Sequence, residues 1–260
     1  MKKLNLLFGI LIGISFLSCS SDSDGKIENE PNFNPKLLKQ ITDNDGYWRK
    51  YFYNENDQIE LTTRTSNQIT LDSTYYFYNG SILSKTLQRI HVPVTGIVNT
   101  ELIYNQFTST IASGTYKIFK DDGTVFQDKT FEFTFSNHLF KSITFFNLDG
   151  TKSQEKTYTH DENGNLTKWD IIWYNPDGTI QTEVQDTFSK WDTSGLKTQS
   201  LFSWNYSVYL PDIYLSNNNC LNRIENGQTF NYSFEYDADG NVTKYNSIDE
   251  QILFTLEYYQ

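Results

Sequence analysis

Tight-turn signals divide this chain at short intervals, and they limit what it can fold into. Six of the seven signals place Asn or Asp directly before a glycine, which can adopt the positive φ that tight hairpin connections require. Three of these glycines follow one another at intervals of fourteen residues, which is typical of a repeat built from one strand of about ten residues and a turn. The signals lie at 43–46, 54–57, 121–123, 148–150, 161–164, 175–178 and 237–240.

Apolar and polar residues alternate between these turns. Phe131, Phe133 and Phe135 share one face of a predicted strand, and the segments 230–237 and 167–173 show the same alternation. A composition of 19 Phe, 18 Tyr and 5 Trp favours strands over long helices. Because short connections join neighbouring strands antiparallel, the sequence predicts an all-β fold. We expect an antiparallel up-and-down meander of repeated hairpins, forming an open curved sheet, a sandwich or a barrel.

Several of the turns lie within longer segments that match one another. Phe234–Tyr245 and Tyr158–Trp169 each carry aromatic residues, an Asp-x-x-Gly turn and then a further aromatic residue, and shorter copies lie at Trp173–Ile180 and Tyr51–Ile59. These segments resemble the YD repeats of bacterial RHS and wall-associated proteins, whose core is Tyr-x-Tyr-Asp-x-x-Gly. The usual Arg after the glycine is missing, and the array is too short for the large hollow shell of long RHS proteins. The resemblance implies a β-repeat domain and assigns no catalytic residue.

The chain begins with a short apolar segment that ends at a cysteine. Lys2 and Lys3 precede the apolar run 4–17, which is shorter than a membrane span of about 20 residues. With Ser18 directly before Cys19, this segment resembles a bacterial lipoprotein signal, in which the cysteine becomes the lipidated first residue of the mature chain. An ordinary cleaved secretory signal and an uncleaved anchor are the alternatives.

The leader also predicts how the chain is divided and where it resides. We expect a lipoprotein signal peptide over residues 1–18, a lipidated Cys19 with a flexible tether over 19–36, and a β-repeat domain over 37–260. The lipid on Cys19 would join the protein to a membrane. Ser20 stands where Asp would favour retention in the inner membrane, so the resemblance implies an outer-membrane lipoprotein that faces the periplasm or the cell surface. Asp22 and Asp24 resemble the acidic export tags of Bacteroidetes surface lipoproteins.

The charge of the chain excludes one class of partner. The formal net charge is −11, and it becomes more negative once the leader and its two lysines are removed. Such a surface repels nucleic acid phosphates and anionic lipid head groups, so we expect no nucleic acid partner. Cys220 has no partner within the chain once Cys19 carries lipid. We interpret Cys220 as a small apolar residue, with an intermolecular disulfide as the alternative.

No residue pattern identifies a reaction. His91, His138 and His160 are far apart, and none has the spacing of a common metal or catalytic motif. The acidic turns lack the twelve-residue frame and the terminal Glu of an EF-hand, although scattered carboxylates leave a calcium site or a glycosidase pair open. We find no serine nucleophile elbow, phosphate-binding loop or paired-cysteine motif. The sequence therefore predicts no catalytic residue, no metal ligand and no cofactor, and it favours a role other than catalysis.

Clusters of aromatic residues are the remaining candidates for a binding site. The candidate ligand-stacking residues are Trp169, Trp173, Tyr174, Trp204 and Tyr206. Alternating aromatic residues in strands are more often core residues than ligand contacts. A carrier of a lipidic ligand would instead need a dry concavity, which we expect to be lined by Phe131, Phe133, Phe135, Phe145 and Phe146.

These observations predict a lipid-anchored cell-envelope protein with a binding or structural role. The polar face or an exposed edge of the predicted sheet would contact another envelope protein or a glycan. A carbohydrate-binding or carbohydrate-active accessory protein is the first alternative, and a carrier of a lipidic ligand is the second.

Overall fold

The computed structural model describes residues 36–66, 69–92, 96–194 and 215–260. All of them belong to one unit, Phe33–Gln260, and the other unit, Met1–Asn32, lies wholly outside the described residues. The predictions about the signal peptide, Cys19 and the tether up to residue 35 therefore fall outside the described part of the chain, as do those about Trp204 and Tyr206.

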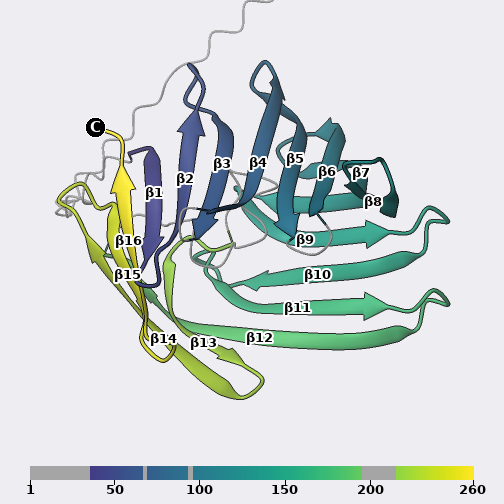
Figure 1. Ribbon diagram of the computed structural model, residues 1–260. Coiled ribbons are helices and arrows are strands. Elements are labelled where there is room, and N and C mark those ends of the chain that lie inside the picture. The colour runs from purple at the N-terminus through teal and green to yellow at the C-terminus, as the bar shows by residue number, and fades with distance from the viewer. Residues whose placement is uncertain (1–35, 67–68, 93–95, 195–214) are drawn as a thin grey trace, which may run out of the picture. The chain divides into compact units, whose positions relative to one another are not determined.

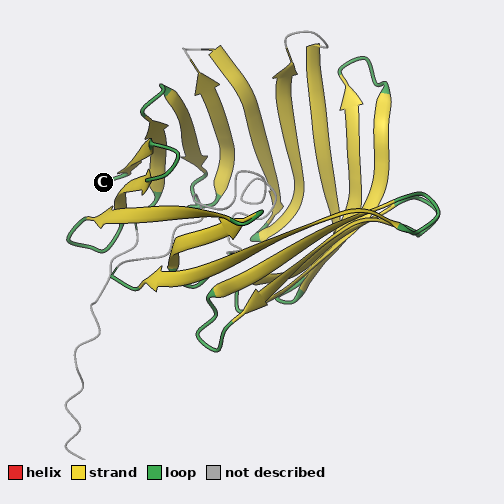
Figure 2. Ribbon diagram, turned by 90° about the horizontal axis from the view of Figure 1, so that it is seen from below, coloured by secondary structure: helices red, strands yellow, loops and turns green. Residues whose placement is uncertain are grey.

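The described residues form a closed barrel of sixteen strands (Figures 1 and 2). Each strand pairs antiparallel with the strands before and after it, and the ring closes where the first strand pairs with the last. This confirms the predicted all-β meander and identifies the barrel among the three architectures. The strands are Leu38–Asp43 (β1), Tyr47–Tyr53 (β2), Ile59–Ser66 (β3), Ile69–Asn79 (β4), Ile82–Val92 (β5), Gly96–Phe107 (β6), Ile111–Lys120 (β7), Val125–Ser136 (β8), Leu139–Phe146 (β9), Lys152–His160 (β10), Leu166–Tyr174 (β11), Ile180–Asp192 (β12), Asn219–Glu225 (β13), Gln228–Tyr236 (β14), Val242–Ser247 (β15) and Ile252–Tyr258 (β16).

Every predicted turn connects two consecutive strands, and the best copies of the repeat share one loop structure. In the β10–β11 loop, Asp161 Oδ1 accepts hydrogen bonds from the amides of Asn163 and Asn165, at 2.9 and 2.8 Å. The amide of Gly164, whose φ is +77°, donates to the Asp161 carbonyl at 3.1 Å. The loop 237–241 repeats these bonds. A short acidic side chain at the first position of the turn thus satisfies the backbone amides of the loop.

The repeat also places aromatic residues opposite each other on neighbouring strands. Tyr158 pairs with Trp169 in the β10–β11 ladder, with ring centroids 6.3 Å apart. Phe234 pairs with Tyr245 in the β14–β15 ladder, with centroids 5.5 Å apart. The repeated motif is therefore a hairpin that adds an aromatic pair to the inward face.

The number of strands fixes where the chain enters and leaves the barrel. Because sixteen is even and every connection reverses direction, β1 begins at the rim where β16 ends, here called the terminal rim. The amide of Tyr259 donates to the Leu37 carbonyl at 2.9 Å, and Lys36 forms an ion pair with Asp237 at 3.1 Å. The loops 54–58, 161–165 and 237–241 lie at the terminal rim, whereas the β11–β12 turn lies at the opposite rim.

Aromatic side chains fill much of the barrel interior. Phe131 and Phe133 are 2% and 0% exposed, and their centroids lie 4.5 Å apart. A first buried cluster runs from β4 to β13 and includes Leu102, Tyr104, Phe131, Phe133, Phe135, Phe140, Phe145, Tyr158, Trp169 and Phe188. A second cluster consists of Tyr232, Val242, Tyr245 and Leu256. The predicted alternation in β8 is thus correct, and its apolar face points inward.

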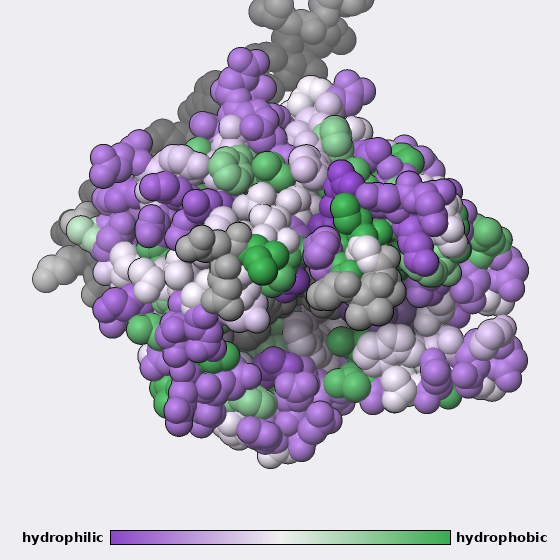
Figure 3. Space-filling model, in the orientation of Figure 1, coloured by the Kyte–Doolittle hydropathy of each residue, from purple (hydrophilic) through white to green (hydrophobic). Residues whose placement is uncertain are grey.

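Charged side chains lie on the outer face of the same strands. Thr86 and Leu102 are 1% and 0% exposed, so Lys85 and Glu101, their neighbours in sequence, point to the opposite face. Outward ion pairs recur around the barrel: Lys39–Glu257, Lys85–Glu101, Lys117–Asp128, Lys168–Asp170 and Lys244–Glu235. Exposed apolar side chains such as Phe77 and Ile103 are interspersed among them. Figure 3 shows this mixture, with hydrophilic residues over most of the visible face.

Closure of the sheet removes one predicted mode of binding. An exposed sheet edge is available only on a strand that lacks a neighbour, and all sixteen described strands have two neighbours. The described strands therefore offer no exposed edge to a partner, and contact through the polar face stays a prediction. Separately, no helix within the described ranges has the length and apolar character needed to cross a membrane.

Candidate ligand site inside the barrel

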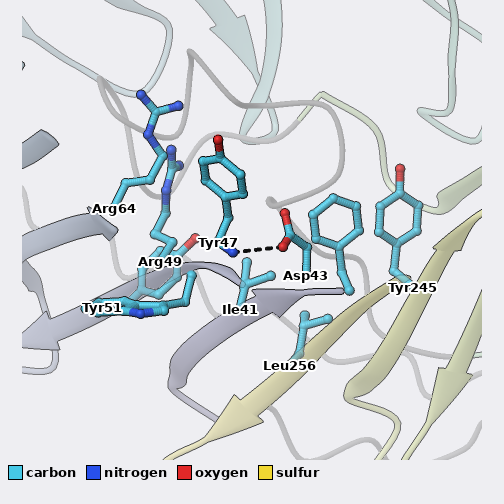
Figure 4. A pocket seen from close by; sticks show the side chains of 10 residues that line it. Ile41, Asp43, Tyr47, Arg49, Tyr51, Arg64, Tyr245 and Leu256 are labelled. Atoms are coloured by element: carbon cyan, nitrogen blue, oxygen red, sulfur yellow. Dashed lines mark hydrogen bonds between the residues drawn. The ribbon is translucent and has the colours of Figure 1, made fainter. Parts of the chain in front are cut away.

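A recess lies on the inner face of β1 to β3 and of β15 and β16. Its cavity volume is about 50 Å3. The recess lies toward the opposite rim, because Asp43 and Tyr47 flank the β1–β2 turn. Figure 4 shows Arg49 and Arg64 side by side on one side of it and Tyr245 on the other.

Strand register brings the arginines of this recess together. Ile41 on β1 pairs with Arg49 on β2, Arg49 pairs with Arg64 on β3, and Arg64 pairs with Asp72 on β4. Ile41 also pairs with Leu256 across the β1–β16 closure. One row of inward side chains therefore runs from an apolar pair, through two arginines, to a carboxylate.

Asp72 is the charged partner within this row. Its Oδ2 lies 2.6 Å from Arg64 Nε, and the side chain is 4% exposed. Burial raises the pKa of Asp72, whereas the positive charges of Arg64 and Arg49 act in the opposite direction. A carboxylate covered to this extent needs its cationic partner, because an uncompensated buried charge is strongly destabilising.

Two further polar side chains, Asp43 and Tyr51, line the recess. Asp43 Oδ1 accepts hydrogen bonds from the amides of Asp45 and Tyr47, both at 2.9 Å, so this oxygen holds the β1–β2 turn. Tyr51 is 6% exposed, and burial raises the pKa of its hydroxyl against the effect of the Arg49 charge. Tyr51 therefore stays protonated at neutral pH and can donate a hydrogen bond.

The facing wall of the recess is apolar. Phe254 stacks on Tyr245 with centroids 5.0 Å apart and an interplanar angle of 19°. Leu256 is 4% exposed and, together with Tyr245, belongs to the second buried cluster. The recess thus combines guanidinium groups on one side with an aromatic and aliphatic surface on the other.

Arg49 and Arg64 are not among the site residues predicted from the sequence. The signal for Arg49 is nevertheless present in β2, where Tyr47, Arg49 and Tyr51 occupy alternate positions and share the inward face. An arginine that alternates with inward aromatic residues along one strand predicts a charged side chain on the inner face of the sheet. The register that places Arg64 directly opposite Arg49 depends on the β2–β3 turn, and the sequence pattern alone does not specify it.

A second recess of about 240 Å3 lies at a different part of the inner wall, also toward the opposite rim. Trp173, which the sequence analysis proposed for ligand stacking, lines it and is half-buried. Gln127 and Gln154 add amide groups, and Lys129 adds an amine whose pKa is lowered by burial. These groups can combine stacking with hydrogen bonding.

The other candidate stacking residues that the structure describes lie elsewhere. Trp169 is 8% exposed, and its Nε1 donates to Asp186 Oδ2 at 2.5 Å inside the barrel. The hydroxyl of Tyr174 donates to Glu155 Oε2 at 3.0 Å. Since Tyr174 follows Trp173 in the strand, it points to the outer face. The structure therefore does not bring Trp169, Trp173 and Tyr174 into one strip.

The phenylalanines proposed to line a lipid-binding concavity mostly pack against one another. Phe131, Phe133, Phe135 and Phe145 are at most 9% exposed, and Phe146 is half-buried. The Phe133 and Phe145 centroids lie 5.9 Å apart. The recess beside Arg49 and Arg64 is lined by other residues.

The remaining polar candidates have structural contacts. His160 Nε2 lies 2.8 Å from the Leu215 carbonyl oxygen, and burial lowers the pKa of His160. Cys220 is 1% exposed, and burial raises the pKa of its thiol to about 11. Within the described ranges, no group of three or more His, Cys, Asp or Glu side chains is arranged to hold a metal ion.

Comparison with known proteins gives information about the fold alone. No family model and no curated protein matches this chain. Among solved structures, a porin-like protein from Bacteroides uniformis ATCC 8492 is 12% identical, with 87% of this chain and 99% of that chain covered and a TM-score of 0.56. A porin-like protein from Bacteroides vulgatus ATCC 8482 is 9% identical, with 86% and 99% covered and a TM-score of 0.46. The chain therefore shares the barrel fold of the first of these proteins.

Proposed function

We propose that this protein is a lipid-anchored component of the cell envelope. Its barrel lies in the aqueous phase outside the bilayer and binds a ligand in its interior. The distribution of side chains carries this proposal. Ion pairs recur on the outer face, while the inner face combines an aromatic core with two recesses. A ligand-binding barrel that works in water needs this arrangement, since its interior supplies both the core and the site.

The outer face argues against a barrel embedded in lipid. A membrane-spanning barrel presents an apolar band about 25 Å tall to the lipid, and a Lys or Arg at the midplane costs about 2–4 kcal/mol. Here Lys117 pairs with Asp128, and Lys244 pairs with Glu235, between strands of the outward face. Water accommodates such pairs readily, whereas hydrocarbon does not.

The anchor in this proposal is lipid on Cys19. Each buried methylene of an acyl chain contributes about 0.8 kcal/mol, so two or three chains hold a protein stably on a membrane. The described chain begins at Lys36 on the terminal rim, and both recesses lie toward the opposite rim. The proposed location is the outer membrane, on its periplasmic or cell-surface side.

Fractionation of cells that express the full chain tests the anchor and the water-facing barrel together. The protein should be recovered with the outer membrane, and Cys19→Ser should be released into the aqueous fraction as a folded barrel that needs no detergent. Cys220→Ser makes the same chemical change at a position inside the barrel and should stay with the membrane. Recovery of the Cys19→Ser chain only in detergent would contradict the proposal. Added protease should degrade the protein on intact cells only if the barrel is displayed at the cell surface.

The second recess supports an alternative function, namely binding of a neutral glycan. An indole ring next to amide side chains matches the apolar faces and hydroxyl groups of sugars. Tryptophan fluorescence of the Cys19→Ser chain, titrated with a panel of neutral oligosaccharides, tests this function. Binding that is lost in Trp173→Ala and kept in Tyr174→Ala, a control on the outer face of the same strand, would support it. Equal binding by both variants would exclude this recess as the glycan-binding site.

A further inference from the structure

We propose that one side of the barrel rests on the surface of the phospholipid bilayer that holds the lipid of Cys19. The contact surface, here called the outer patch, lies on the outer face of β2–β6. It consists of Phe52, Leu61, Tyr75, Phe77, Leu87 and Ile103. This inference rests on the proposed function, because it requires the lipid anchor, and it adds the orientation of the barrel on the membrane.

Strand register makes the outer patch continuous. Phe52 pairs with Leu61 across β2 and β3, and Leu61 pairs with Tyr75 on β4. Tyr75 pairs in turn with Leu87 on β5. Phe77 follows two positions after Tyr75 and therefore lies beside this row on the same face of the sheet. The apolar side chains thus form one connected surface.

The side chains of the outer patch point away from the core and are accessible. Tyr75 lies between Thr74 and Tyr76, which are 0% and 5% exposed, so Tyr75 points outward. A connected apolar surface on the outside of a water-facing protein marks an interaction site. Four members, Phe52, Tyr75, Phe77 and Ile103, are 36% to 45% exposed, and Leu61 and Leu87 are half-buried.

The charge around the outer patch differs from that of the whole chain. The chain has a formal net charge of −11. Apart from the inward row of two arginines and one carboxylate, the charged residues of β2–β6 are Lys50, Lys85, Arg89, Glu60 and Glu101. Basic side chains thus outnumber acidic ones here. The excess negative charge that would repel phosphate head groups is absent from this side of the barrel.

The basic side chains are combined with aromatic rings in a way that suits a bilayer surface. Lys85 Nζ lies 5.3 Å from the centroid of the Phe77 ring, and Lys50 Nζ lies 4.5 Å from the Trp48 ring. At a membrane, such rings lie at the level of the head groups, while lysine amines extend to the phosphate oxygens. In a twofold dimer through this patch, the same basic residues would face each other. Phosphate groups complement them instead.

The place where the chain enters the barrel brings the outer patch close to the membrane. Lys36 lies at the terminal rim, and β2–β6 follow β1 around the ring (Figure 1). Every residue of the outer patch lies within five positions of the end of its strand at this rim. Sixteen residues separate Cys19 from Lys36, and a flexible chain of that length spans about 20–24 Å on average. Lipid on Cys19 would therefore hold the patch within reach of the bilayer.

The contact depends on the anchor. No side chain of the outer patch is more than 45% exposed, so the patch offers limited apolar area to the bilayer. Lipid on Cys19 raises the effective concentration of the bilayer next to the patch, so the contact forms in the anchored chain. Cys19→Ser lacks this advantage and is still released into the aqueous fraction, as the proposed function requires.

The accessibility of spin labels on phosphatidylcholine vesicles tests the inference. One nitroxide is attached at Ser73→Cys, beside Tyr75 on the outer face of β4, and another, in a separate chain, at Gln185→Cys on the outer face of β12. β12 lies eight strands from β4 in the ring of sixteen, and the two positions are six and seven residues from the terminal rim. Cys220 is 1% exposed and escapes the label. A barrel that stands upright on its rim would expose both labels equally.

We expect the membrane to protect only the label beside the outer patch. Collisions of the Ser73→Cys label with a water-soluble nickel complex should fall about threefold or more in the lipidated chain on vesicles, relative to the chain that also carries Cys19→Ser. The Gln185→Cys label should show no change.

Phe77→Ser is the informative variant and should restore at least half of the lost collisions. Phe126→Ser is the matched control, because Phe126 is 52% exposed and has the amine of Lys120 at 5.4 Å from its ring, but lies on β8 outside the outer patch. Phe126→Ser should restore none. The thermal midpoint of each variant confirms that it is folded.

The possible failures can be told apart. If the lipidated chain floats with the vesicles while the Ser73→Cys label stays as exposed as in solution, the inference is overturned and the anchor stands. Protection that persists in folded Phe77→Ser would also overturn it. Protection in Cys19→Ser without vesicles, growing with protein concentration, would assign the patch to a second copy of this chain. A lipidated chain that does not float with the vesicles would contradict the proposed function and the inference together.

Discussion

Phe133→Ala tests whether the aromatic face of the barrel forms its core. Phe133 is 0% exposed and touches the rings of Phe131, Phe140 and Phe145, with centroids 4.5 to 6.4 Å away. An aromatic side chain buries roughly 150–250 Å2, worth about 4–6 kcal/mol at about 25 cal/mol per Å2, and alanine retains part of that contact. We expect the free energy of unfolding to fall by about 3–5 kcal/mol.

Phe126→Ala is the matched control, because the same atoms are removed from a side chain that is 52% exposed. Its cost should stay below about 1 kcal/mol. Urea denaturation followed by near-ultraviolet circular dichroism measures both changes, and the thermal midpoint of Phe133→Ala should fall by roughly 6–20 °C. Equal losses at the two positions, or a loss under 1 kcal/mol at Phe133, would refute the assignment of this face to the core.

Three further predictions concern single groups. Burial lowers the pKa of Lys156 to about 8 from the ordinary 10.5, so the folded chain binds fewer protons than the unfolded chain between these values. The free energy of unfolding of the wild-type chain minus that of Lys156→Met should therefore rise by about 1–3 kcal/mol from pH 8 to 10.5 in urea titrations, because the other titrating groups contribute equally to both chains. Because burial raises the pKa of the Cys220 thiol, Cys220 should resist a thiol reagent at pH 8 in the folded Cys19→Ser chain and react once urea unfolds it, whereas rapid labelling without urea would contradict its burial. Gly164→Ala should destabilise the barrel more than Gly178→Ala, since both have a positive φ but a Cβ at Gly164 would collide with the side chain of Asn217, and equal thermal midpoints would exclude that collision.

Seven of the hairpin connections of this barrel can be predicted from sequence because their signals are local. In six of the seven turns an acidic residue and a glycine lie within four residues of each other, and the alternation in segments such as 131–135 shows which face is buried. Each of the expected turns joins consecutive strands. The aromatic pair Tyr158–Trp169 follows from the same short segment.

Closure of the barrel and the arginine recess depend on contacts that are distant in sequence. Pairing of Ile41 with Leu256 joins strands at the two ends of the described chain, and nothing local to either strand specifies it. The recess combines Arg49 and Arg64 from the first three strands with Phe254 from the last. Trp169 lies in a cluster of aromatic residues and was therefore a candidate for ligand stacking. Its indole instead packs inside the barrel, where Asp186 accepts its hydrogen bond.

The pairing of β1 with β16 has a consequence for engineering. With Tyr259 hydrogen-bonded to Leu37, a short linker could connect Lys36 to Gln260, the two ends of the described barrel, and the chain could be cut at the exposed β9–β10 turn with every strand pairing kept. Such a circular permutant would keep the Arg49 recess intact. It would also allow a lipidated cysteine to be grafted onto the opposite rim, so that the two recesses would face the bilayer.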